Sequence, residues 1–457
     1  MRPTIVILVV GLSPRHIGPD TPHIRALSRG GAMRPLSAVT PAVTCPAQAT
    51  FITGGLPRDH GIVANGWLFR DLMEVWLWRQ SNRLVAGEMI WDAGRRLDAA
   101  FTTASLFWWY SMAATHDIGV APRPIYRADG RKLPDCYTKP LELRDELTTQ
   151  LGAFPLFNFW GPAVSIKASR WIADAALHVR RTRSPTLSLV YLPHLDYDLQ
   201  RLGPNDPHIV TSLREVDAVA GALMADAERD GARIIVLSEY GITPVSTSVH
   251  VNRALREAGL LRVRREGDGE LLDPNQSDAF AVSDHQIAHI YIANPELIEE
   301  VRRIVEALPG VERVLDRAAQ SALGLDHARS GELVALAQHD AWFTYYYWLD
   351  DHHAPDFARL VEIHRKPGYD PAELYIDPAI RFPSLAIGWR LARRALGFST
   401  LMDVIPLDAT LVKGSHGRVT DHASDGPLFV SSEARLTPDG PVAATSVKEL
   451  ILRHVFA

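Results

Sequence analysis

Three short runs of apolar, mostly β-branched residues constrain the fold of this 457-residue chain more than any other feature. They are Ile5–Val10, Leu187–Leu192 and Arg233–Leu237, and each is followed by polar or turn-forming residues. A strand that is apolar on both sides must be covered on both sides, as strands of parallel sheets are. We therefore expect an α/β fold with a doubly wound, mostly parallel sheet, helices on both faces and functional residues at the carboxyl ends of the strands.

Periodic helical stretches at 168–181 and 209–229 alternate with these runs, and two aromatic-rich segments interrupt the alternation. The first spans about 67–162 and the second about 243–356. Clusters of this kind build cores and can also line ligand pockets. We predict a single domain over residues 1–457 in which these two insertions contribute a cap or a substrate-pocket region.

Composition excludes several classes of protein. A net charge of −5 gives no case for binding nucleic acid or an acidic membrane surface. Two cysteines, Cys45 and Cys136, cannot build a disulfide framework or a cysteine-based zinc module. The apolar N-terminal run meets the turn Gly11-Leu12-Ser13-Pro14 without a cleavage site, which favours a strand over a signal peptide. We expect a cytoplasmic protein with no membrane or nucleic-acid partner, and the oligomeric state stays open.

The most specific text is TPAVTCPAQAT at 40–50, followed by TGGLPRDHGIVAN at 53–65. In order and spacing it resembles the alkaline phosphatase superfamily, in particular the type I phosphodiesterase/nucleotide pyrophosphatase branch. The resemblance implies that Thr44 is a nucleophile and that Asn65 binds a phosphate oxygen. A hydroxyl at a helix N-terminus suits attack on a phosphoryl group, and an amide can stabilise the charge that develops there.

Later segments match further landmarks of the same family in order, so the resemblance spans the chain from Val6 to about Val455. They are a metal loop at 191–204 (YLPHLDYDLQRLGP), a loop at 237–242 (LSEYGI), a turn at 366–369 (KPGY) and a loop at 414–417 (GSHG).

The two-metal site that the resemblance implies uses three Asp, three His and the threonine hydroxyl. Here Val10 replaces the first Asp, Gln200 replaces a His, and Glu239-Tyr240 replaces an Asp-His pair. The candidate ligands are therefore Asp196, Glu239, His416, Gln200 and Tyr240. This set is poor in charge and nitrogen for two zinc ions. Two occupancies of the site are compatible with these residues: one divalent ion (Mg²⁺, Mn²⁺ or Zn²⁺), or no metal at all.

Other polar side chains near these landmarks are weaker candidates. His364 and Lys366 lie beside the Pro-Gly-Tyr turn and are candidates for binding the anionic part of a substrate. We interpret a further group as surface or hydrogen-bonding residues, namely His194, Asp198, Asp284, His285 and His289.

Two functions follow from these residues. The first is a hydrolase or phosphoryl-type transferase that acts on a small phosphate ester or phosphodiester, with Thr44 as nucleophile and a remodelled metal site. The second is a non-catalytic relative that binds a phosphorylated metabolite or a partner protein, because four of the six ligand positions have changed.

Overall fold

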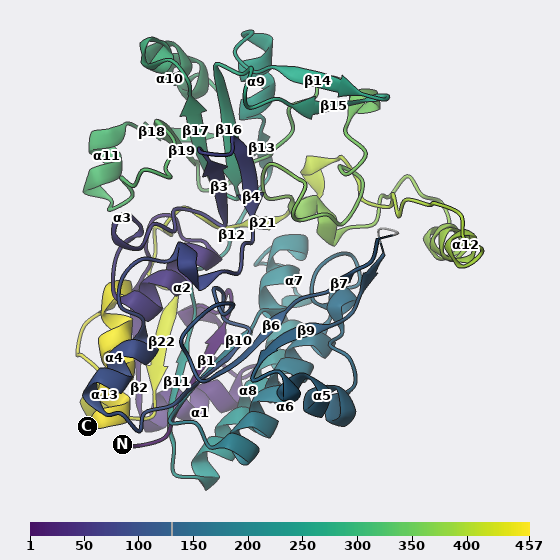
Figure 1. The fold of residues 1–457 in the computed structure, drawn as a ribbon. Helices are drawn as coiled ribbons and strands as arrows, with labels where there is room; N and C mark the ends of the chain where they lie inside the picture. The colour runs from purple at the N-terminus through teal and green to yellow at the C-terminus, as the bar shows by residue number, and fades with distance from the viewer. Residues whose placement is uncertain (129–130) are drawn as a thin grey trace.

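A nine-stranded sheet forms the centre of the protein in the computed structural model, which describes residues 1–128 and 131–457 (Figure 1). Strand β1 pairs in parallel with β10 on one side and β11 on the other, with Thr4 opposite Leu187 and Arg233. β5 and β6 extend the parallel part, while β22, β2 and β9 pair antiparallel to neighbours. In spatial order the strands are β23 (Val442–Ala443), β2 (Ala32–Ser37), β22 (Leu428–Ser431), β11 (Arg233–Leu237), β1 (Thr4–Val9), β10 (Leu187–Leu192), β5 (Thr103–Leu106), β6 (Ile118–Pro122) and β9 (Cys136–Lys139).

Helices cover both faces of this sheet, as the apolar strands require, so the mostly parallel α/β fold is confirmed (Figure 1). One face carries α1 (Pro22–Gly30), α5 (Glu142–Leu151), α6 (Ile166–Arg183), α7 (His194–Leu202) and α8 (Ile209–Arg229). The other carries α2 (Thr44–Thr53), α4 (Ile90–Leu97) and α13 (Val447–Phe456). Strand residues Ile5–Val10 are fully buried between these layers.

A second, antiparallel sheet is built from the segment that follows β11. Its four strands are β16 (Ala279–Asp284), β17 (Ile287–Ile292), β19 (Leu333–Ala337) and β18 (Val311–Leu315), in that order. Around it lie α9 (Val251–Glu257), α10 (Ile298–Glu306), α11 (Arg317–Ala322) and the hairpin β14 (Val263–Glu266) to β15 (Gly269–Leu272). This part corresponds to the second aromatic-rich segment, and it sits above the carboxyl edge of the central sheet (Figure 1).

The first aromatic-rich segment is only in part an insertion, because β5, β6 and β9 of the central sheet arise from it. These strands are short and rich in small residues, which hides them from an apolar-run pattern. The rest of the segment forms the hairpins β3 (Gly66–Phe69) to β4 (Glu74–Leu77) and β7 (Ile125–Tyr126) to β8 (Lys132–Leu133).

Short elements complete the fold. They are α3 (Pro57–His60), the pairs β12 (Thr243–Pro244) with β21 (Gly414–Ser415) and β13 (Thr247–Val249) with β20 (Ala341–Phe343), and α12 (Pro383–Ala395). Helix α12 projects away from the rest of the molecule (Figure 1). Among the described residues, no helix combines the length and apolarity that crossing a bilayer would require.

Candidate active site

The candidate residues gather where β1, β10 and β11 end. Helix α2 begins at Thr44, after an extended Val43, and ends at Gly54, whose φ of 78° is one that glycine adopts readily. Helix α7 follows β10 and carries Asp196 and Gln200 four residues apart, on one face. Tyr240 follows β11, and His416 follows β21. The topology therefore brings residues from four distant segments together.

A chain of hydrogen bonds links the candidate nucleophile to a buried carboxyl group. The hydroxyl of Tyr240 donates to Oδ1 of Asp196 at 3.2 Å, and the Thr44 and Tyr240 hydroxyl oxygens are 3.2 Å apart. Because the Tyr240 proton is used toward Asp196, Thr44 donates to Tyr240. Burial raises the pKa of Asp196 to about 7, although the bonds from Tyr240 and Gln200 oppose the rise. A carboxyl group in this state can accept a proton near neutral pH.

The second oxygen of Asp196 is held by an amide. Nε2 of Gln200 donates to Oδ2 of Asp196 at 2.7 Å, and the hydroxyl of Tyr369 donates to Oε1 of Gln200 at 2.9 Å. The oxygen of Gln200 that could bind a metal ion is therefore occupied by a protein donor. Gln200 orients Asp196 as a hydrogen-bonding partner.

Four aromatic rings pack in a row beside this chain, with Tyr240 stacked on His416, His285 stacked on Tyr369, and the two imidazoles tilted by 36° to each other. The ring centroids of Tyr240 and His416 are 3.6 Å apart, those of His416 and His285 are 3.6 Å apart, and those of His285 and Tyr369 are 3.7 Å apart. Burial lowers the pKa of His416 to about 3 and that of His285 well below its usual value, so both rings are neutral at pH 7. Stacking at this distance is compatible with uncharged imidazoles.

The tautomer of His416 follows from its neighbours. Its Nδ1 lies 2.9 Å from the carbonyl oxygen of Ala42 and must donate to it. Its Nε2 therefore carries a lone pair, lies 3.9 Å from Oδ1 of Asp196 and has no hydrogen-bond partner among the described residues. His416 thus offers a single acceptor atom next to the cavity.

Glu239 lies beside Thr44 and close enough to Asp196 that, in addition to burial, the charge of Asp196 contributes to raising its pKa. Its carboxyl group is fully buried, and Nε2 of Gln48 donates to its Oε1 at 2.5 Å. Gln48 in turn accepts from the backbone N–H of Trp109 at 2.8 Å. Burial raises the pKa of Glu239 well above its usual value. Glu239 therefore stays near Thr44 and Asp196, and Gln48 holds its Oε1.

The amide groups of Asn65 form hydrogen bonds with other residues of the protein. Its Oδ1 accepts from the backbone N–H of Cys45 at 2.9 Å, directly after the candidate nucleophile. Its backbone N–H and its Nδ2 both donate to the carboxylate of Asp284, at 2.7 and 3.0 Å. Asn65 therefore fixes the first turn of α2, and burial raises the pKa of its partner Asp284 to about 7.

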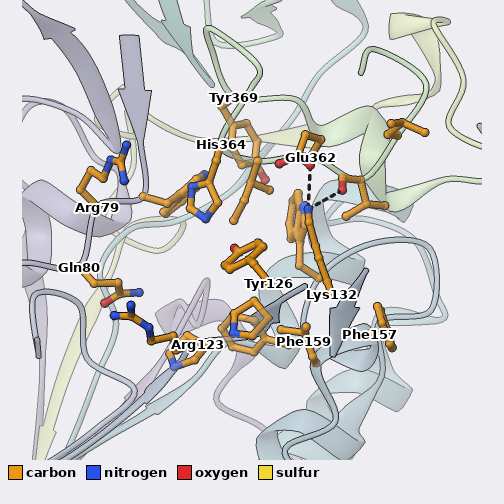
Figure 2. Close-up of a pocket in the computed structure, with 18 of the residues that line it drawn as sticks. Arg79, Gln80, Arg123, Tyr126, Lys132, Phe157, Phe159, Glu362, His364 and Tyr369 are labelled. Carbon is orange, nitrogen blue, oxygen red and sulfur yellow. Dashed lines mark hydrogen bonds and ion pairs between the residues drawn. The ribbon is translucent and has the colours of Figure 1, made fainter. Parts of the chain in front are cut away.

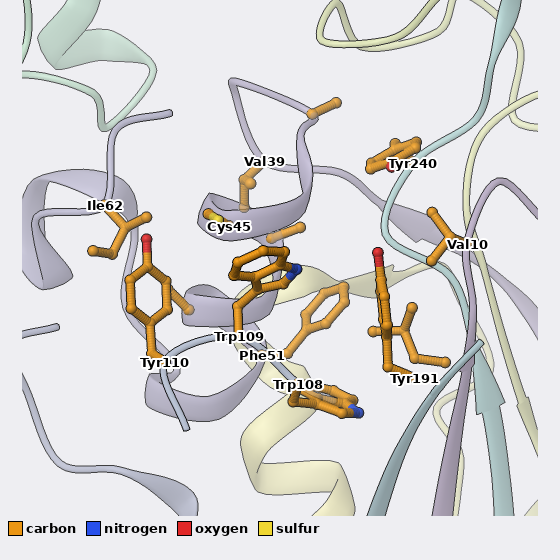
Figure 3. Close-up of a cluster of buried hydrophobic side chains, with 14 of the residues drawn as sticks. Val10, Val39, Cys45, Phe51, Ile62, Trp108, Trp109, Tyr110, Tyr191 and Tyr240 are labelled. Atoms are coloured by element: carbon orange, nitrogen blue, oxygen red, sulfur yellow. The ribbon is translucent and has the colours of Figure 1, made fainter. Parts of the chain in front are cut away.

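An apolar cluster occupies the side of the site where the resemblance implies an aspartate. Val10, at the end of β1, is fully buried and lies with Tyr191 and Tyr240 in Figure 3. Trp109 and Phe51, which belongs to α2, extend the cluster (Figure 3). This surface supplies no charge that could balance a bound cation.

The residues present do not fit the pair of zinc ions that the resemblance implies. No group of three His, Cys, Asp or Glu side chains within residues 1–128 and 131–457 is arranged to hold a metal ion. Val10 cannot coordinate, each carboxylate oxygen of Asp196 already accepts a hydrogen bond from Tyr240 or Gln200, and His416 is packed between two rings. Two divalent cations need several free carboxylates and imidazoles, which this set lacks.

Thr44 and the ring stack open into a cavity of 1540 Å³ (Figure 2). Aromatic side chains dominate its lining: Trp76, Trp78, Trp109, Tyr126, Phe157, Phe159 and Trp160. Four cationic side chains also contribute: Arg79, Arg123, Lys132 and Arg394. Figure 2 shows Arg79 and Arg123 on one side of the cavity and Phe157 and Phe159 on the other. The lining suits a bulky, mostly apolar ligand that carries negative charge.

The two predicted anion-binding residues have different positions. His364 lines the cavity, where its Nδ1 lies 3.4 Å from the carbonyl oxygen of Leu77. Lys366 lies outside the cavity lining, is almost fully buried, and has its ammonium 2.7 Å from both Asp370 and Glu373. We therefore correct the role of Lys366: it neutralises two buried carboxylates of its own segment and is not available to a substrate.

Sequence reasoning missed three residues of the site. His285 and Asp284 were interpreted as ordinary hydrogen-bonding groups, yet His285 completes the ring stack and Asp284 positions Asn65. Gln48, one turn after Thr44, was not considered and binds Glu239. The only sequence feature that indicated any of these three residues was the adjacent Asp284-His285 pair just before a predicted strand.

Comparison with known proteins agrees with this fold. Among solved structures, the chain matches phosphonoacetate hydrolase from Sinorhizobium meliloti in complex with phosphonoformate, at 16% identity and a TM-score of 0.63, over 99% of this chain and 96% of that one. It also matches an inactive murine ectonucleotide pyrophosphatase/phosphodiesterase 5 in complex with AMP, at 14% identity and a TM-score of 0.60, over 100% and 95% of the two chains. At these identities the likeness establishes the fold.

One sequence relative and one family model add evidence from the sequence to this likeness of fold. An uncharacterised pyrophosphatase/phosphodiesterase of Schizosaccharomyces pombe is 25% identical over 244 residues, which are 50% of this chain and 41% of that protein. The match thus spans less than half of that relative's length. The family model for type I phosphodiesterase/nucleotide pyrophosphatase matches residues 4–370. The chain therefore belongs to the type I phosphodiesterase/nucleotide pyrophosphatase family.

Proposed function

We propose that the protein hydrolyses a phosphate ester or phosphodiester of a bulky, largely apolar molecule, with Thr44 as nucleophile. The observation that carries the proposal is the hydrogen-bonded chain from Thr44 through Tyr240 to Asp196 at the floor of the aromatic cavity. Family membership and the phosphonoacetate hydrolase neighbour support hydrolysis at phosphorus. A remodelled hydrogen-bonding site takes the place of the metal pair.

The chain gives the attacking hydroxyl a path for its proton. Oγ1 of Thr44 forms a bond to phosphorus while the bond from phosphorus to the leaving-group oxygen breaks. The Thr44 proton passes to the Tyr240 oxygen as the Tyr240 proton passes to Asp196, whose pKa of about 7 lets it accept the proton near neutral pH. The leaving alkoxide then takes a proton from Asp196 or water, and water hydrolyses the phosphothreonine.

Charge on the phosphoryl group is met by the N-terminus of α2 and by cavity cations. Thr44 is the first residue of this ten-residue helix, so a phosphoryl group on its hydroxyl lies at the positive end of the helix dipole. Arg79 and Arg123 point from the cavity wall (Figure 2). The aromatic lining then binds the apolar part of the substrate.

The test is release of p-nitrophenol from p-nitrophenyl phosphate and bis-p-nitrophenyl phosphate. We expect Thr44→Ala to abolish turnover and Tyr240→Phe to lower kcat by about a hundredfold or more, since a positioned proton acceptor contributes that much. Tyr375→Phe is the matched control, because the Tyr375 hydroxyl bonds the backbone oxygen of Arg201 outside the cavity. A chelator should leave the rate unchanged. Full activity of Thr44→Ala would contradict the proposal.

A second function, the binding of a phosphorylated metabolite without turnover, is favoured by the state of Asn65. Its amide and the Cys45 N–H are satisfied within the protein, so neither is free to stabilise the charge that develops on the phosphoryl group during hydrolysis, whereas Arg79 and Arg123 still line the cavity for binding a phosphate. Ligand binding raises the unfolding temperature of a protein. A shift with p-nitrophenyl phosphate in the absence of turnover, lost in His364→Ala, would favour this alternative over hydrolysis.

A further inference from the structure

Helix α12 presents two different stripes along its length. Ile387, Leu391 and Arg394, spaced four and three residues apart, line the cavity. Ile387 also packs against the small cluster of Val404 and Ile405, which ties the helix to the body. This stripe accounts for how α12 is held, and it leaves the opposite side of the helix for another role.

The opposite stripe is apolar and faces solvent. Leu385, Trp389 and Leu396 follow one another at four and seven residues, so they share one side of the helix. Their side chains are 72%, 66% and 76% exposed, and Phe398 just beyond the helix is 58% exposed. An exposed group of large apolar side chains indicates a surface that binds a membrane or another molecule.

The charge around this stripe is of one sign. Residues 381–402 contain four arginines and no acidic residue, in a chain whose net charge is −5. Arg390 pairs with Asp403 at 2.7 Å, whereas Arg381, Arg393 and Arg394 form no ion pair within the described part of the chain. Basic residues beside an exposed apolar stripe with a tryptophan are typical of helices that lie in the interface of an anionic membrane.

We propose that α12 docks the protein on an anionic lipid surface, with Leu385, Trp389 and Leu396 inserted between headgroups and Arg393 beside them. A second copy is a poor occupant of the same stripe, because two facing copies would bring their arginines together. The inner stripe of α12 lines the cavity, so docking brings the cavity rim to the bilayer surface. Net charge alone offers no case for a membrane partner, since the local excess of arginine is hidden in an acidic total.

Co-sedimentation with lipid vesicles tests the proposal on the full chain. We expect binding to vesicles of phosphatidylcholine and phosphatidylserine in equal parts, little binding to phosphatidylcholine alone, and release in high salt. Leu385→Ser with Trp389→Ser should weaken binding at least about tenfold, and Arg393→Gln about fivefold. Leu141→Ser is the matched control, since Leu141 is a 78% exposed leucine on another part of the surface.

Two results would overturn the proposal. Equal vesicle binding by wild type and the Leu385/Trp389 variant would show that the stripe is not inserted. Absence of vesicle binding, with light scattering showing a dimer that the same variant dissociates, would assign the stripe to a second copy. Arg393→Gln changes one exposed side chain, so its effect is readable even if the double variant folds poorly.

Discussion

At the scale of single residues, the identity of residue 240 decides what chemistry the site can perform. A histidine there would present an imidazole to a metal ion, whereas Tyr240 presents a hydroxyl that bridges Thr44 and Asp196. Its ring also stacks on His416. One substitution thus accounts for both the proton path and the filling of the space beside Asp196.

Lys366 and His364 are close in sequence and differ in role, which gives a paired prediction. Lys366→Met leaves Asp370 and Glu373 without their cation, so we expect a loss of about 3–5 kcal/mol in the free energy of unfolding. His364→Gln should change that free energy little and raise the KM for a phosphate ester, because His364 lines the cavity. Denaturant unfolding and steady-state kinetics of both variants provide the check. A stable Lys366→Met protein with a raised KM would reverse the assignment.

At the scale of elements, the junction of α2 and α3 depends on a neutral histidine. His60 is buried, its Nδ1 accepts from the Ile62 N–H at 3.1 Å, and its Nε2 lies 3.1 Å from the Thr50 hydroxyl. Burial, then the nearby charges of His327 and Arg329, lower the pKa of His60 to about 3. Protonation at Nδ1 would remove the acceptor that Ile62 uses.

This junction gives a pH-dependent prediction. The folded pKa of His60 lies below the unfolded value of about 6.5, so its contribution is present above pH 6.5 and is lost as pH falls toward 3. Between about pH 7 and pH 5 the loss amounts to about 2 kcal/mol. His60→Asn keeps an acceptor for Ile62 and does not titrate, so its stability should fall by about 2 kcal/mol less than that of wild type over this range. Urea unfolding at both pH values measures the difference, and parallel pH dependences would exclude this role.

At the scale of the whole molecule, the cavity joins elements that lie far apart in the chain. Its walls come from the β4 hairpin, the β7 and β8 hairpin, α7, α12 and the segment around Tyr369. A space of 1540 Å³ is larger than a small phosphate ester needs. The apolar lining is therefore expected to contribute binding energy only when the leaving group is bulky.

Substrate size should accordingly control the rate. We predict that kcat/KM for a naphthyl phosphate exceeds that for methyl phosphate at least about tenfold beyond the intrinsic difference in leaving groups, since each buried Å² of apolar surface contributes about 25 cal/mol. Phe159→Ala should reduce this ratio, because Phe159 lines the cavity. A ratio unchanged by Phe159→Ala would show that the aromatic wall does not contact the substrate.

The sequence by itself determined the parallel sheet, its covering helices and the position of Thr44 at the start of α2. Each depends on local patterns: apolar runs of strand length, helical periodicity and a motif whose residues are close in sequence. The grouping of Asp196, Gln200 and His416 with Thr44 came from the family resemblance of their motifs and not from a local pattern.

Only the tertiary structure decided what these residues do together. Tyr240 bridges Thr44 and Asp196 because β1, β10 and β11 place loops nearly 200 residues apart within hydrogen-bond distance. Glu239 is held beside Thr44 by Gln48 of α2, and His285 joins the group from the second sheet. Lys366 is removed from the cavity by two carboxylates that its own segment folds onto it. These outcomes depend on distances and directions between remote segments, which no local pattern encodes.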